Sequence, residues 1–194
     1  MCIRDRIKDF RYGVGINLAF NKNRVTDFKG ELRYELDEDV KDIWGNPTMR
    51  YTNLADVSTG GDTRRVEGHM IDEFFLRRPY SGDGSYKLAD GSVNPNGGPR
   101  DGMIRTKADL DWVAAMLAAG YTFNNNLKQI NSNGSNLWYG DLIMADLNGD
   151  GKYGNDDDRE FTGKSSTPKV TLGFNINASW RGFDLNMMLS LIHI

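Results

Sequence analysis

The stretch F-R-Y-G-V-G-I-N-L-A-F, from Phe10 to Phe20, alternates apolar residues with small or polar ones throughout. Such alternation puts all the apolar side chains on one face of an extended strand. The stretch V-T-L-G-F-N-I-N-A-S-W, from Val170 to Trp180, repeats the pattern. A third stretch begins at Phe183, with Leu185 and Met187 in the apolar phase. The three stretches predict an all-β fold built from long antiparallel strands.

The length of these strands favours a membrane β-barrel. Strands in soluble proteins usually have about 5 to 6 residues, whereas outer-membrane strands need about 9 to 11. The small and polar second face suits the lumen of a barrel, although the solvated face of a soluble antiparallel sheet has a similar composition. The residues predicted to face the membrane are Phe10, Tyr12, Val14, Ile16, Leu18, Phe20, Val170, Leu172, Phe174, Ile176, Trp180, Phe183, Leu185 and Met187.

The four residues W-R-G-F, Trp180 to Phe183, predict a two-residue hairpin turn. The residues that flank such a turn are paired and point to the same side, so Trp180 and Phe183 would lie together at the rim of the barrel, where aromatic girdles occur. Short turns of outer-membrane barrels lie on the periplasmic side and long loops outside. Residues 25–168 are therefore expected to form a long extracellular excursion.

Within this excursion the sequence predicts one short helix. Thr106 is the expected N-cap, with Asp109 three residues on, and the helix would end at Gly120. Irregular strands are expected over Arg64–Leu76 and Asn136–Ala145. The stretches 80–102 and 124–136 are rich in Gly, Asn, Ser and Pro, which predicts loops.

The stretch A-D-L-N-G-D-G-K-Y-G-N-D-D-D-R, 145–159, resembles a calcium loop. Its spacing predicts ligands at positions 1, 3, 5, 7 (the backbone carbonyl) and 12, which are Asp146, Asn148, Asp150, Lys152 and Asp157. The closing ligand is open among Asp156, Asp157 and Asp158. A calcium ion here would be structural, ordering the loop. The alternative is a cluster of Asx-turns without a metal.

The two termini, M-C-I-R-D-R at 1–6 and L-S-L-I-H-I at 189–194, are interpreted as a sequencing adapter. One valid coding of the second is, over most of its length, the reverse complement of a coding of the first. Without them the chain has no cysteine, and its only histidine is His69. Removing Arg4, Asp5 and Arg6 moves the net charge from -3 to -4. We therefore expect neither Cys/His zinc sites nor nucleic-acid binding.

No set of residues predicts catalysis, so an enzyme is not expected. His69 has no nucleophile beside it in the sequence and is interpreted as an ordinary loop or strand residue. Asp109 and Asp111 are interpreted as solvated charges rather than as a glycosidase pair. For the tryptophans of the excursion, packing is favoured over stacking on sugars.

The segment L-W-Y-G-D-L-I-M-A-D-L-N-G-D-G, 137–151, resembles the SusC/RagA family of TonB-linked outer-membrane transporters of Bacteroidota. The similarity continues in Asp158-Arg159, in the T-P-K-V-T-L-G-F strand at 167–174 and in W-R-G-F-D-L at 180–185. The early strand into N-K-N-R-V, 21–25, is also similar to the family.

The resemblance implies a fragment of a large antiparallel transmembrane β-barrel in the cell outer membrane. Residues 7–24 would be a barrel strand, 25–168 the extracellular region with its calcium-like loop at 146–157, and 169–188 a barrel hairpin. It implies nutrient uptake of glycans or peptides, a SusD-like lipoprotein as partner, contact with outer-membrane lipid, and coupling to TonB through an N-terminal region outside this sequence. The alternative is a calcium-stabilised secreted adhesin or glycan-binding β-domain.

Overall fold

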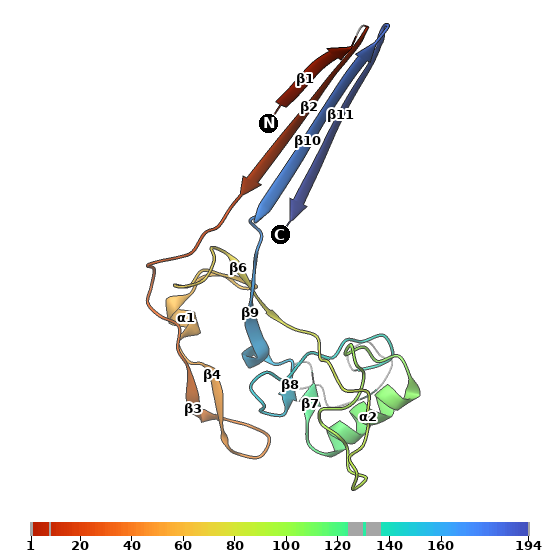
Figure 1. Cartoon of the computed structure of the whole chain (residues 1–194). Coiled ribbons are helices and arrows are strands. Elements are labelled where there is room, and N and C mark those ends of the chain that lie inside the picture. The colour runs from red at the N-terminus through yellow and green to blue at the C-terminus, as the bar shows by residue number, and fades with distance from the viewer. Residues whose placement is uncertain (1, 8, 124–129, 131–136, 194) are drawn as a thin grey trace.

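The computed structural model of the chain describes residues 2–7, 9–123, 130 and 137–193. It has two parts: a narrow sheet that includes both ends of the chain, and an excursion that folds beyond one end of that sheet (Figure 1). Antiparallel strands dominate both parts and helices are few, so the fold is all-β in class, as predicted.

The narrow sheet contains four strands in the order β1-β2-β10-β11, all antiparallel. Their bounds are Cys2–Ile7, Phe10–Phe20, Val170–Trp180 and Phe183–His193. The partnership of β2 with β10 is continuous from Phe20↔Val170 to Phe10↔Trp180. Strands β1 and β11 form the two edges, so the sheet is open.

The observed strands differ from the predicted segments at the ends of the chain. Strand β2 lies inside the predicted segment 7–24, whereas β11 continues past 188, and β1 consists mainly of residues interpreted as adapter. An edge strand presents unpaired N–H and C=O groups that any extended segment can pair with. Pairing of the terminal residues therefore follows from the open edge, and the adapter interpretation stays a prediction.

The turn between β10 and β11 has the predicted two residues. Arg181 and Gly182 both have positive φ, 46° and 91°, the signature of the type I′ turn whose twist suits a hairpin. Trp180 is paired with Phe183, which confirms the prediction that they lie on one side. The Arg181 guanidinium lies 5.7 Å from the Trp180 ring centroid, and its Nε lies 3.6 Å from Asp9 Oδ2.

The excursion begins and ends side by side. Phe20 is paired with Val170, and the next residue, Asn21, donates its backbone N–H to the carbonyl of Lys169 at 2.9 Å. The strands between them are β3 Tyr34–Lys41, β4 Pro47–Tyr51, β5 Thr63–Arg64, β6 Glu73–Arg77, β7 Thr122–Phe123, β8 Lys152–Tyr153 and β9 Arg159–Ser165. They form the β3-β4 hairpin, the three-stranded sheet β5-β6-β9 and the small parallel pair β7-β8.

The hydrophobic core of the chain lies in the excursion, around helix α2 (Lys107–Ala118). Thr106 caps α2 in a reciprocal capping box with Asp109, which confirms the predicted start of the helix. Gly98, at φ 74°, lets the 80–102 loop approach the Trp112 ring, since a Cβ there would lie 2.7 Å from it. The buried core residues are Tyr80, Ile104, Trp112, Val113, Met116, Phe123, Leu137, Ile143 and Tyr153.

Three predictions within the excursion were wrong or incomplete. The described residues include a second helix, α1 (Leu54–Val57), and a 3₁₀ turn, η1 (Asp156–Asp158), besides the one helix predicted. The described part of 136–145 makes only isolated bridges, and Gly140 at φ 92° interrupts the extended backbone; Asn136 lies outside the described residues. Of the predicted strand 64–76, only the two ends are in strands, β5 and β6, and residues 65–72 form no strand. The loop prediction for 80–102 is confirmed, and that for 124–136 falls almost wholly outside the described residues.

Candidate functional site

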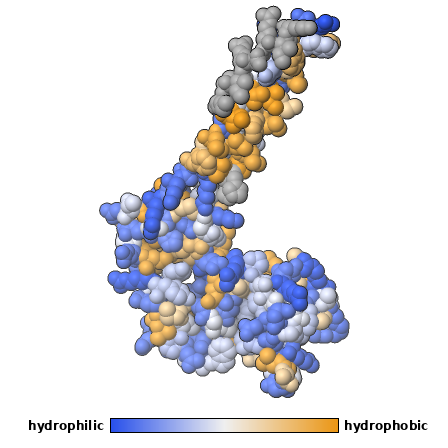
Figure 2. All heavy atoms as spheres, in the orientation of Figure 1, coloured by the Kyte–Doolittle hydropathy of each residue, from blue (hydrophilic) through white to orange (hydrophobic). Residues whose placement is uncertain are grey.

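The apolar residues of β2, β10 and β11 form one continuous face. The register pairs Ile16 with Phe174, and Phe174 with Leu189, and the rows from Leu172 to Trp180 are apolar on the same side. Figure 2 shows the resulting hydrophobic surface along the projecting sheet. The structure brings together on this face all fourteen residues predicted to face the membrane.

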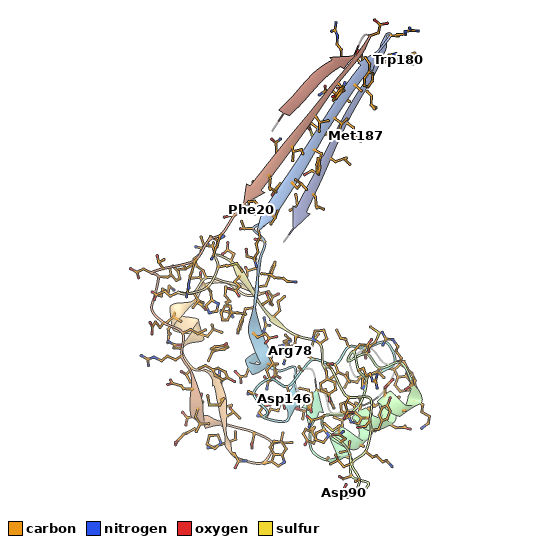
Figure 3. The ribbon with its side chains drawn as sticks, in the orientation of Figure 1. Phe20, Arg78, Asp90, Asp146, Trp180 and Met187 are labelled. Carbon is orange, nitrogen blue, oxygen red and sulfur yellow. The ribbon has the colours of Figure 1, made fainter. Side chains whose placement is uncertain are left out.

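This face is not covered by the rest of the chain. Among the described residues, the extensive contacts of β2, β10 and β11 are with one another and with β1. Side chains along the face are exposed or half-buried, and the exposed fraction is highest at the two ends, 74% for Phe20 and 76% for Phe183. Figure 3 shows Phe20 and Trp180 at opposite ends of the sheet, with Met187 between them. A soluble domain would bury such a face against a second layer.

In β2 and β10 the opposite face is mostly small and polar, whereas β11 places Met188 and Ile192 on it. It contains glycines in β2 opposite asparagines in β10, as in the pairs Gly13↔Asn177 and Gly15↔Asn175. A Cβ at Gly13 would lie only 2.5 Å from Asn177 Oδ1, so the asparagine amide occupies the space above the glycine. The two faces therefore differ sharply in polarity, as they do in strands that separate lipid from a water-filled lumen.

The predicted calcium loop is closed by hydrogen bonds from backbone amides to carboxylates. Asp146 Oδ1 accepts from Gly149 at 2.7 Å, and its Oδ2 accepts from Gly151 at 2.8 Å. Asp150 is buried; its Oδ1 accepts from the Lys152 amide, and Asn148 Oδ1 accepts from the Asp150 amide. This is the arrangement that the Asx-turn alternative predicts.

The side chains of the acidic run at the end of the loop point in different directions. Asp157, the predicted closing ligand, is turned toward Arg50, with Asp157 Oδ1 3.2 Å from the Arg50 Nε. Asp158 is fully buried instead, and it accepts from Leu147 at 2.6 Å and from Gly154 at 2.8 Å. Burial raises the pKa of Asp158 to about 7 and also raises the pKa of Asp146. Asp158 is thus the carboxylate that closes the loop.

The residues of this loop have the chemistry of a calcium site but not its assembled geometry. The desolvated carboxylate oxygens of Asp146 and Asp158 are hard donors suited to calcium. Within the described chain, however, no three His, Cys, Asp or Glu side chains converge as a metal site. Calcium binding therefore stays a prediction.

The structure also shows where His69 and the tryptophans considered in the sequence analysis lie. His69 Nδ1 lies 3.1 Å from Glu73 Oε2, and the imidazole packs on the Phe161 ring. Trp112 is buried in the core, as the packing interpretation predicts, whereas Trp44 and Trp138 are exposed. A cleft around Arg64 in the excursion could not be predicted from the sequence, because the walls of the cleft come from several separate segments.

The chain was compared with known proteins. No protein-family profile matches it, and no curated protein matches it. Among the described residues, no helix has the length and hydropathy to cross a membrane.

Proposed function

We propose that this chain is part of an outer-membrane transporter whose β2, β10 and β11 strands cross the lipid bilayer. The observation that carries the proposal is the uncovered apolar face of these strands, backed by a polar face. The resemblance to SusC/RagA transporters supports the same assignment.

The dimensions of the sheet are consistent with a bilayer. An 11-residue strand spans about 34 Å between its end residues at roughly 3.4 Å per step. With a tilt of about 40°, this corresponds to about 26 Å along the membrane normal, close to the apolar band of about 25 Å found in outer-membrane barrels. The aromatic residues Phe10, Trp180 and Phe183 then lie at one boundary of the band, and Phe20 lies at the other.

The excursion would lie on the extracellular side and form part of the surface that receives cargo. In this proposal the cargo is a glycan or a peptide, a SusD-like lipoprotein covers the excursion, and TonB supplies energy through another region of the transporter. The calcium-like loop at 146–157, called the carboxylate loop from here on, would stabilise the excursion, with calcium as a structural ion. The secreted adhesin alternative receives less support, because its apolar strands would need a covering layer.

Cysteine labelling in cells tests the membrane assignment. On a Cys2→Ser background, Leu18→Cys and Asn17→Cys place thiols at adjacent positions on opposite faces of β2. The chain would be expressed with a secretion signal and its outer-membrane fraction treated with a water-soluble maleimide and with a lipid-partitioning maleimide. We expect Asn17→Cys to react with the aqueous reagent and Leu18→Cys with the lipid-partitioning one.

Two outcomes would count against the proposal. Equal labelling of both positions by the aqueous reagent would place the two faces in water. Recovery of the chain as a monomer in detergent-free buffer, with Leu18→Cys protected from both reagents, would indicate a soluble domain that buries this face.

A further inference from the structure

A cleft of about 440 Å³ lies in the excursion between β4, α1, β5, β6 and the η1 turn. We call it the arginine cleft and define it by Arg50, Tyr51, Arg64, Phe75, Asp157 and Arg159. Figure 1 shows α1, β4, β6 and β9 in the part of the excursion away from helix α2. The cleft is lined wholly by residues of the excursion.

Two of the three arginines in the cleft have acidic partners. The Arg50 Nε lies 3.2 Å from Asp157 Oδ1. Arg159 is held by Asp62 at 2.7 Å and by Asp156 at 3.5 Å. Each of these guanidinium groups is therefore largely neutralised by the protein itself.

Arg64 differs from these two arginines. Among the described residues no acidic side chain lies within ion-pair distance of Arg64, which is what separates it from Arg50 and Arg159. Its buried Nε, like that of Arg50, has no hydrogen-bond partner there. Its Nη1 donates to Ser58 Oγ at 3.2 Å, and its guanidinium lies 5.5 Å from the Phe75 ring centroid. Burial lowers the pKa of Arg64 and the nearby Arg159 lowers it further, while the charge of Asp62 acts in the opposite direction. A buried, unpaired guanidinium donor costs free energy unless a ligand or water satisfies it.

The surroundings of Arg64 hold its guanidinium in place. Strand β5 pairs Arg64 with Glu73 of β6, which fixes the backbone, while Phe75 and Ser58 fix the side chain from two directions. A planar guanidinium held in this way is prepared for two parallel hydrogen bonds to a planar oxyanion.

We propose that the arginine cleft binds the carboxylate of a ligand, with Arg64 as the residue that recognises it. A singly charged carboxylate matches the one guanidinium left without an acidic partner. A phosphate dianion fits less well, because Asp156 and Asp157 line the same cleft. Tyr51 and Phe75 provide aromatic surface beside the charge, suited to the ring of an acidic sugar or to the chain of a peptide. The inference does not depend on the membrane assignment.

Titration calorimetry of the full chain in a zwitterionic, sugar-free detergent tests this proposal. The probes are D-glucuronate and N-acetylglycine, which offer a carboxylate from a sugar and from a peptide, with methyl glucoside and inorganic phosphate as controls. We expect at least one of the two carboxylates to bind more tightly than either control. The stronger of the two identifies the source of the carboxylate.

Two substitutions separate recognition by Arg64 from general charge. Arg64→Gln should weaken carboxylate binding about tenfold or more, because hydrogen bonds between charged groups are the strong ones. Arg65→Gln is the matched control, since Arg65 is the next residue, is paired with Asp72 at 3.1 Å and is exposed. It should change the affinity less than about twofold. Arg64→Lys keeps the positive charge but loses the planar guanidinium and its paired hydrogen-bond donors, so it should give an intermediate affinity.

The proposal is overturned if methyl glucoside or phosphate binds as tightly as both carboxylates. It is also overturned if Arg64→Gln binds like the unsubstituted chain, or if Arg65→Gln loses as much affinity as Arg64→Gln. Should Arg64→Gln fail to fold, the Arg64 Nε–Hε resonance of the ¹⁵N-labelled unsubstituted chain decides. A shift on addition of the bound carboxylate supports the proposal, and an unchanged resonance refutes it.

Discussion

Replacement of Phe174 by arginine should expel the chain from lipid, whereas the same replacement at the next residue should not. Phe174 lies in the central strand β10, paired on its two sides with Ile16 and Leu189, near the middle of the apolar face. Asn175 lies on the polar face, opposite Gly15. The two positions share strand, depth and sequence neighbourhood, and they differ in the face they occupy.

The expected magnitude follows from the depth of Phe174. Arginine on the lipid face near the bilayer midplane costs about 2 to 4 kcal/mol in membrane β-barrels. At about 1.4 kcal/mol per factor of ten, this corresponds to a loss of roughly 30- to 700-fold in the membrane-bound population. Arginine at Asn175 would face the polar side and should change this population less than about threefold.

Flotation with neutral phosphatidylcholine vesicles measures the effect. The unsubstituted chain, Phe174→Arg and Asn175→Arg are refolded with vesicles from denaturant, and the protein in the floating fraction is quantified. Neutral lipid is used so that the added positive charge gains no attraction to the surface.

The reasoning would be refuted by equal losses for the two variants, or by no loss for Phe174→Arg. If Phe174→Arg instead lowered the thermal midpoint of an unsubstituted chain that remains soluble and does not float, the face would be the core of a soluble domain. The membrane assignment would then be wrong.

Three further predictions concern the excursion. Thr106→Ala removes the capping box of α2 and should lower the free energy of unfolding by about 1 kcal/mol in denaturant titrations, whereas Lys107→Ala removes only an exposed ion pair and should leave the free energy of unfolding nearly unchanged. Calcium should bind the carboxylate loop in calorimetry and be lost in Asp150→Asn but kept in Asp90→Asn, whose carboxylate caps a separate turn; no binding below millimolar calcium in the unsubstituted chain would refute the site. In EDTA, the raised pKa of Asp158 should contribute stability that is fully present below about pH 4 and lost as the pH rises through about 7, a dependence that Asp158→Asn should flatten in the thermal midpoint.

The sequence was sufficient where structure is set by local periodicity or by a cap. Alternation defined β2 and β10, because a period of two has one interpretation over eleven residues. The side chains of Thr106 and Asp109 fixed the start of α2 by a contact between residues three apart. The four residues W-R-G-F were sufficient to predict the two-residue turn between β10 and β11.

The sequence was insufficient where distant segments meet. The adjacency of β2 and β10 could not be predicted, since both strands show the same alternation and nothing local encodes their partner. The β3-β4 hairpin was missed because its acidic first strand resembles a solvated charged run. Arg64 was missed as a candidate binding residue because its isolation from acidic partners depends on where β4, β6 and η1 come to lie.

The base of the excursion, where Phe20 is paired with Val170 and Asn21 is bonded to Lys169, gives the molecule a modular construction. The entry and exit strands lie about 4.8 Å apart, the spacing of any hairpin. A short turn could therefore replace everything between them without altering the register below. The free energy of closing a loop grows only with the logarithm of its length, so large insertions at this point are tolerated. Evolution, or a protein engineer, could thus exchange the whole surface cap while leaving the strands unchanged.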